Sequence, residues 1–74
     1  MPDFPVEVRV YLPGGQAAAQ RFAAELPAGY DRIVEDHGQY GWAVLVSRPD
    51  WLAVDEAYAD LEPLAAEYDG ELDH

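Results

Sequence analysis

Residues 6–26, VEVRVYLPGGQAAAQRFAAEL, decide the fold, because the spacing of their apolar side chains changes partway along. In VEVRVYL, valine and leucine alternate with Glu7, Arg9 and Tyr11, which is the period-two pattern of a strand with one buried face. A Pro-Gly-Gly turn follows, and residues 16–26 are strong helix formers. The segment therefore predicts a strand that turns directly into a helix. The apolar flank of this helix consists of Ala18, Ala19, Phe22, Ala23 and Leu26.

The next segment predicts a hairpin of two strands. Residues 30–36 and 40–48 flank His37-Gly38-Gln39, a short loop that contains a glycine. Nearly every position of residues 40–48 is apolar, which is typical of a strand that is buried on both faces or central in its sheet. We therefore expect residues 40–48 to form such a strand and His37 to be an exposed turn residue.

Residues 50–68 predict the longest helix. Asp50 is the expected N-cap, and Pro63 is expected to kink the helix on its solvent side. Gly70 is expected to end it in the left-handed conformation, which glycine adopts without strain. Trp51 is expected in the core, with a partly exposed interface anchor as the alternative. The apolar face of this helix consists of Trp51, Val54, Ala57, Tyr58, Leu61, Leu64, Ala65 and Tyr68.

A very short last strand completes the pattern. Only residues 71–74 follow Gly70, and Leu72 is the one side chain among them that is suited to point inward. The predicted order is β-α-β-β-α-β, in a single domain of residues 1–74. This order is typical of an α+β sandwich of ferredoxin-like type, with an antiparallel sheet and both helices on one face.

The composition excludes several classes of protein. The chain contains no cysteine, so it has neither a disulfide framework nor a thiolate metal site. No apolar run approaches the roughly 18–20 residues that span a bilayer. The first ten residues, MPDFPVEVRV, lack the basic and apolar regions of a signal peptide. We expect a soluble, cytoplasmic protein that does not contact a membrane.

The charge of the chain points to a basic partner. Fifteen acidic residues face four arginines and no lysine, and the net charge is −11. From Asp50 onward there are nine acids and no basic residue. Direct nucleic-acid binding is disfavoured, because phosphate contacts need clustered Lys and Arg. A basic protein surface is the natural electrostatic partner, while the alternative is that the acids only keep the protein soluble.

No catalytic, cofactor-binding or metal-binding residue is predicted. Asp69, Glu71 and Asp73 beside His74 lack the ligand number and loop spacing of a calcium site. Ser47 lacks the surrounding motif of a nucleophile, and His37 lacks a nearby nucleophile and orienting group. Two glycines before a helix, without Lys, Ser or Thr, are explained by turn geometry. We therefore expect no enzyme activity and no cofactor.

Several segments together resemble the RraB family, regulators of ribonuclease E activity. They are LPGGQAAAQRFAAEL followed by GY, then GWAVLVSR, then LEPLAAEYDGELD. The resemblance covers about residues 6–73. Leu72 stands where the family usually has tyrosine, His74 where Gly-Trp would follow, and Pro63 within the helix is unusual. The positions that match are Pro13, Ala18, Ala19, Leu26, Gly29, Tyr30, Trp42, Leu61, Leu64, Ala65, Tyr68, Gly70, Glu71 and Asp73.

The resemblance implies a non-enzymatic regulator that binds ribonuclease E outside its catalytic centre and modulates or inhibits RNA decay. Ribonuclease scaffolds that bind RNA are arginine-rich, so an acidic surface suits such a partner in sign. The expected partner-binding residues are the acids of the second helix and of the terminal strand. They are Asp55, Glu56, Asp60, Glu62, Glu67, Glu71 and Asp73.

Two other functions remain open on the sequence. One is an immunity or antitoxin protein that neutralises a basic toxin, since a small acidic α+β domain suits that role equally well. The other is a small ferredoxin-like enzyme of the cofactor-free oxygenase type, which needs a polar cluster between helices and sheet. The uncovered face of the sheet is also a candidate dimer contact, through Leu45 or Tyr11.

Overall fold

A computed structural model describes residues 6–73 and confirms the α+β class. The boundaries of the strands and of the first helix lie within two residues of those predicted. Residues 38–40 form a short 3-10 helix. Residues 38 and 39 were expected in the hairpin loop, and residue 40 was expected to begin the next strand. In chain order the elements are β1 (Val6–Leu12), α1 (Gly15–Glu25), β2 (Asp31–Asp36), the 3-10 helix η1 (Gly38–Tyr40), β3 (Trp42–Arg48), α2 (Val54–Glu67) and β4 (Glu71–Leu72).

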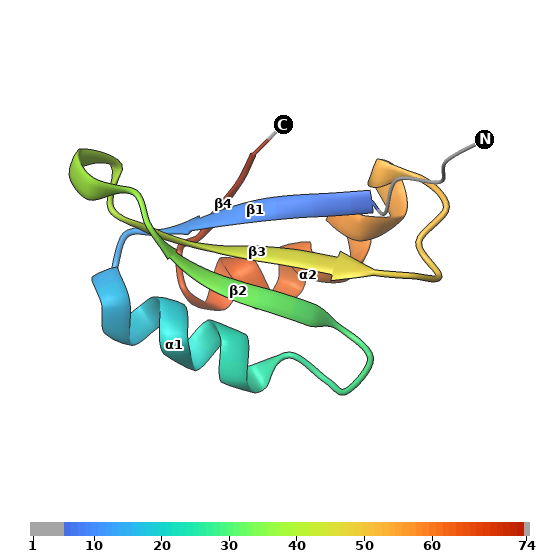
Figure 1. Ribbon diagram of the computed structural model, residues 1–74, viewed down its shortest axis with the longest axis horizontal. Helices are drawn as coiled ribbons and strands as arrows, with labels where there is room; N and C mark the ends of the chain where they lie inside the picture. Colours follow the sequence, from blue (N-terminus) through green and yellow to red (C-terminus); the bar gives the residue numbers. More distant parts are fainter. Residues whose placement is uncertain (1–5, 74) are drawn as a thin grey trace.

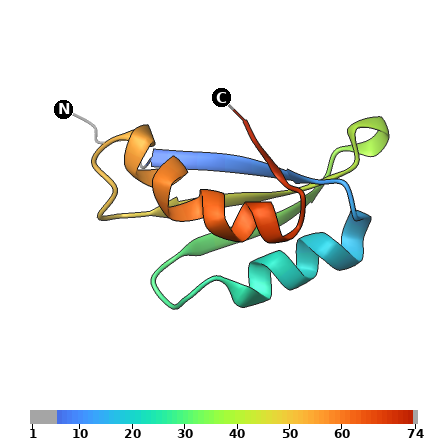
Figure 2. The same cartoon turned by 180° about the vertical axis from the view of Figure 1, so that it is seen from behind.

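The sheet has the strand order β2-β3-β1-β4, and every neighbouring pair is antiparallel. β3 therefore lies in the centre of the sheet, as its apolar sequence predicted, and it separates β1 from β2. α1 packs on β1, β2 and β3, whereas α2 packs on β1 and β4. Figure 1 and Figure 2 show both helices on the same side of the sheet, so the other side is uncovered. The predicted ferredoxin-like arrangement, with a short last strand, is confirmed.

An apolar layer between the sheet and the two helices forms the core. Val10 and Val44, which are opposite each other on β1 and β3, are both fully buried. Phe22 of α1 is also fully buried, and its ring meets the Tyr68 ring edge-on at 6.0 Å, which links the two helices. The buried cluster consists of Val8, Val10, Leu12, Ala19, Phe22, Ala23, Leu26, Val44, Val46, Trp51, Ala57, Leu61 and Ala65.

An arginine of β2 holds the end of α1. Arg32 Nη1 donates to the carbonyl oxygens of Ala23 and Leu26, the latter at 2.9 Å, and Nη2 donates to that of Pro27 at 2.9 Å. The last carbonyls of a helix have no partner within the helix, and α1 has no basic residue in its own last turn. The guanidinium of Arg32 therefore replaces the cap that the helix sequence lacks.

The start of α2 differs from the prediction. The helix begins at Val54, and Asp50 is not its cap, because both Asp50 carboxylate oxygens accept from Arg48 at 2.8 and 2.6 Å. Trp51 precedes the helix and is only 6% exposed, which confirms the core prediction. Its Nε1 donates to Asp60 Oδ2 at 2.8 Å, and this bond ties the preceding loop to the helix. Val54 is 42% exposed, so its assignment to the apolar face was wrong.

The end of α2 also corrects one prediction. Asp69 adopts the left-handed conformation (φ 54°), whereas Gly70 does not. Gly70 is needed for space instead, because a Cβ there would lie 3.0 Å from Val10 Cγ1. The Gly70 amide donates to the Ala65 carbonyl at 2.7 Å and closes the helix end. Pro63 lies within α2 on its exposed side, as expected.

Candidate functional site

The expected partner-binding acids of α2 are all exposed, but two of them have internal roles. Asp60 accepts the Trp51 indole bond, and Glu56 accepts a long bond from the Leu52 amide at 3.4 Å. The other three have no hydrogen bond or ion pair to residues 6–73 and are directed to solvent. These three acids are Asp55, Glu62 and Glu67.

The two acids of the terminal strand lie at the edge of the sheet. Glu71 pairs with Tyr11 in the β1–β4 register, so its side chain is on the uncovered face. The Asp73 amide donates to the Arg9 carbonyl at 2.8 Å, and its carboxylate lies 3.9 Å from Arg9 Nη1. Glu71 also lines a surface hollow of 610 Å³ together with Glu62 of α2. The predicted acids of α2 and β4 therefore meet at this edge.

The structure tests the prediction for Leu72 but not the one for His74. Leu72 packs against the core, as predicted for the inward residue of a stub strand. The His74 position, where the resemblance expects Gly-Trp, lies outside the described residues.

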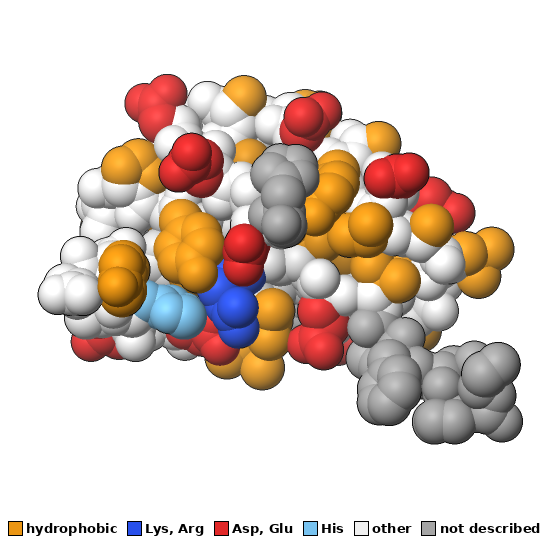
Figure 3. Space-filling model, turned by 90° about the horizontal axis from the view of Figure 1, so that it is seen from above, with side chains coloured by type: hydrophobic (Ala, Val, Ile, Leu, Met, Phe, Trp, Pro, Cys, Tyr) orange, Lys and Arg blue, Asp and Glu red, His pale blue; other side chains and the backbone are white. Residues whose placement is uncertain are grey.

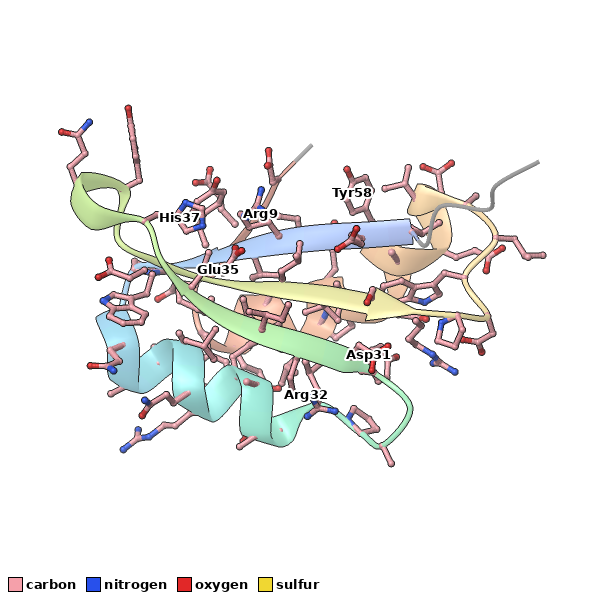
Figure 4. The ribbon with its side chains drawn as sticks, viewed as in Figure 1. Arg9, Asp31, Arg32, Glu35, His37 and Tyr58 are labelled. Atoms are coloured by element: carbon pink, nitrogen blue, oxygen red, sulfur yellow. The ribbon has the colours of Figure 1, made fainter. Side chains whose placement is uncertain are left out.

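A polar network that the sequence did not predict lies on the uncovered face of the sheet. Arg9 Nε donates to Glu35 Oε1 at 2.8 Å, and His37 Nε2 lies 3.0 Å from the same oxygen. Figure 4 shows these three side chains together on one side of the sheet, with Arg32 on the opposite side toward α1. Hydrogen bonds from Arg9 first and from His37 second lower the pKa of the Glu35 carboxyl below its ordinary value. The carboxyl thus remains ionised and anchors both neighbours.

His37 is therefore not the exposed turn residue that was expected. Its side chain is only 28% exposed, and its ring meets the Tyr11 ring edge-on at 5.6 Å. Ala43 lies between Tyr11 and Glu35 in the strand register and is fully buried although no helix covers it. Its small side chain leaves room for the network to lie across the sheet.

The rest of the uncovered face combines acids with apolar side chains. Glu7, Ser47 and Asp31 lie side by side across three strands, and both acids are exposed. The next row contains Leu45, which is half-buried, and Ile33, which is 59% exposed. Figure 3, viewed from the side opposite α1, shows histidine and arginine side chains surrounded by hydrophobic and acidic ones. The face is thus a mixed surface on which negative charge dominates.

A second hollow, of 390 Å³, lies at one end of this face. The end of β1, the η1 loop and the α2–β4 turn meet there. Its lining includes two aromatic and two acidic side chains. The full lining is Tyr11, Leu12, Pro13, Gly15, Gln39, Tyr40, Gly41, Asp69 and Glu71.

Residues 6–73 contain no group of three or more His, Cys, Asp or Glu side chains placed to hold a metal ion. Asp69, Glu71 and Asp73 are thus not gathered into such a group. None of the helices in the same range is long and apolar enough to span a membrane.

No family model, no curated protein and no solved structure matches this chain. The resemblance to the RraB family therefore stays a prediction that rests on the segments quoted above. What the structure adds is the placement of the acids and the network on the uncovered face. The network depends on strand register, so the only sequence signal for it was that Arg9 and Glu35 occupy outward positions of their strands.

Proposed function

We propose that the protein is a non-enzymatic binding protein whose acidic surface docks on a basic segment of a partner protein. The acidic surface is defined as the seven acids expected from the sequence. Its members are Asp55, Glu56, Asp60, Glu62, Glu67, Glu71 and Asp73.

One observation carries the proposal, namely that negative charge is exposed and largely unpaired. Every acid in residues 6–73 except Glu35 is exposed. Only Glu35, Asp50 and Asp73 form ion pairs with arginine within the same range. A basic partner therefore finds free carboxylates over α2 and at the β4 edge.

The arginines of the protein neutralise this surface only at Asp73, which lies 3.9 Å from Arg9. Arg9 and Arg48 are bound to acids of their own neighbourhoods, and Arg32 is bound to the carbonyl oxygens at the end of α1. Arg21 is exposed on α1 near Tyr68 at the end of α2, where it is one positive charge against the several acids of this surface. The field around α2 and β4 is thus negative, which raises the encounter rate with a basic partner and helps orient it.

The buried layer supports a binding role over catalysis. Within residues 6–73 it contains no buried polar or charged side chain. The oxygenase-type alternative needs a polar cluster between the helices and the sheet. The buried side chains between the helices and the sheet are apolar instead. Any chemistry would have to come from the exposed surface, where side chains are in contact with water.

The partner class that the resemblance implies is a ribonuclease E-type enzyme, whose activity this protein would modulate or inhibit. A basic toxin would also be a positively charged partner. Identification of the bound partner therefore distinguishes a ribonuclease regulator from an immunity or antitoxin protein. The test is a pull-down with the tagged full chain at rising salt, followed by mass spectrometry and by binding of the purified candidate.

A matched pair of variants controls for charge alone. Asp55→Asn/Glu62→Gln removes two charges from α2, and Glu7→Gln/Asp31→Asn removes two from the far end of the uncovered face. We expect a basic partner that is released by salt and that the α2 variant retains less well than the control. Retention of only neutral or acidic proteins, or binding that ignores ionic strength, refutes the proposal.

A further inference from the structure

The hollow lined by Tyr11, Tyr40, Asp69 and Glu71, called the tyrosine pocket below, has the chemistry of a cation site. Its aromatic side chains come from β1 and η1, and its carboxylates come from the α2–β4 turn and β4. No basic side chain is part of its lining. Aromatic faces attract cations through the ring quadrupole, most effectively when carboxylates lie nearby to pair with the charge.

The carboxylates of the pocket are available to a ligand. Asp69 and Glu71 are both exposed, and neither side chain forms a hydrogen bond or ion pair with another residue of 6–73. Arg9, on the same strand as Tyr11, is bound by Glu35 and Asp73 and does not fill the pocket. An anion is disfavoured there, because the two carboxylates would repel it.

The aromatic side of the pocket is held in place before any ligand arrives. The Tyr11 ring rests against the His37 ring, and His37 is itself bound to Glu35. The loop that carries Tyr40 is closed by backbone bonds from His37 to Gly41 at 2.8 Å and from Gly41 to Gly38 at 3.0 Å. Tyr40 is nevertheless 74% exposed. A large aromatic side chain that is exposed on an ordered loop loses little conformational entropy when a partner covers it.

The backbone at Asp69 does not itself require a carboxylate side chain. Its φ of 54° lies in the left-handed region, which glycine adopts more readily than any residue with a side chain. A glycine would therefore satisfy the turn, whereas the aspartate adds a negative charge to the pocket.

We propose that the tyrosine pocket binds an arginine side chain of the basic segment that docks on this protein. The inference rests on the proposed function and names the place where the partner is anchored. The planar guanidinium stacks on an aromatic ring and pairs with carboxylates at the same time, which a lysine ammonium does less well. The acids of α2 then contribute long-range attraction, while the pocket selects the side chain.

The test measures binding of a dye-labelled arginine-rich peptide, by fluorescence anisotropy, to the full chain and its variants. Tyr40→Ala should weaken binding about two- to fivefold, the value of one cation–π contact at an exposed site. Asp69→Asn/Glu71→Gln should weaken it more than the α2 variant Asp55→Asn/Glu62→Gln, which removes the same charge. Asparagine tolerates the left-handed conformation at position 69, and thermal unfolding confirms that each variant is folded.

A peptide with lysine in place of arginine supplies the second comparison. It should bind the wild-type protein more weakly than the arginine peptide does, and Tyr40→Ala should reduce this preference. In NMR spectra, the backbone amide signals of Tyr40 and Asp69 should shift when the arginine peptide is added.

The outcomes separate the two proposals. If the wild-type protein binds the arginine peptide but Tyr40→Ala and the Asp69/Glu71 variant bind equally well, the pocket is refuted and the acidic surface stands. If the wild-type protein fails to bind the peptide at low salt, both are refuted.

Discussion

Replacing Gly70 by alanine should destabilise the fold, because the glycine is required for space. A Cβ at this position would lie 3.0 Å from Val10 Cγ1, 3.3 Å from the Ala65 carbonyl oxygen and 3.4 Å from Leu12 Cδ1. Val10 is fully buried on β1 and Ala65 O belongs to the helix backbone, so neither atom moves away easily. The added methyl group must therefore displace β4 from β1 or strain the end of α2.

The magnitude follows from two opposing effects. Overpacking of a core position typically costs about 1–3 kcal/mol, and the smaller freedom of alanine in the unfolded chain returns about 0.4–1 kcal/mol. We expect a net loss of about 1–2 kcal/mol in the free energy of unfolding. A protein of this size has a total of about 4–11 kcal/mol, so the loss is large but the variant should still fold.

Urea unfolding followed by tryptophan fluorescence measures the change. With a slope of about 1 kcal/mol/M for a small domain, the midpoint should fall by roughly 1–2 M. Gly70→Asn distinguishes the steric reason from a conformational one, because asparagine adopts the left-handed conformation but is larger than alanine. We expect Gly70→Asn to be less stable than Gly70→Ala. Equal or greater stability of Gly70→Ala than of the wild-type protein refutes the reasoning.

Two further predictions concern the arginine cap and the network on the uncovered face. Arg32→Met should lower the free energy of unfolding by about 1.5–3 kcal/mol, because charged hydrogen bonds to the carbonyl oxygens at the end of α1 are lost; urea unfolding measures this, and a wild-type midpoint contradicts it. Glu35→Gln should destabilise the protein most near neutral pH. The pKa of Glu35 is lower in the folded protein than its ordinary value of 4.5, so the ionised carboxyl stabilises the fold at pH values above 4.5. This stabilisation is lost as the pH falls through the pKa of the folded state. Urea unfolding at several pH values should show the difference between wild type and Glu35→Gln shrinking toward acid pH, whereas a constant or growing difference contradicts the assignment.

The sequence predicted the parts of the fold that depend on local pattern. The alternation of Val8 and Val10 with Glu7 and Arg9 predicted β1, and the continuous apolar run of β3 predicted its central place, because burial imposes these periods. Trp51 was also correctly predicted to be buried, although it precedes α2 and does not lie on the apolar face of the helix.

The errors lie where a tertiary contact competes with a local preference. Asp50 has the chemistry of a helix cap, but Arg48 lies two residues away and binds both of its oxygens. Gly70 has the conformational freedom for a helix end, but Asp69 takes the left-handed position and Gly70 meets Val10 instead. Such competition is decided by distances between elements, which no local pattern contains.

The candidate site was predictable in charge and not in geometry. The acids of α2 were expected to be exposed from their helical spacing, and they are. The tyrosine pocket joins Tyr11, Tyr40 and Asp69 from three separate segments, so it exists only after the sheet is assembled. The same holds for the Arg9–Glu35 bond, which links strands that are not neighbours in the sheet.

The most direct test of the proposed function compares two peptides of identical sequence, one with arginine and one with citrulline, its neutral isostere. Anisotropy titrations with the wild-type protein at several salt concentrations give the dissociation constant of each peptide. We predict that the arginine peptide binds at low salt, that its affinity falls steadily as salt is raised, and that the citrulline peptide binds at least tenfold more weakly, a difference of about 1.4 kcal/mol. Equal affinity for the two peptides would contradict a docking surface for basic partners.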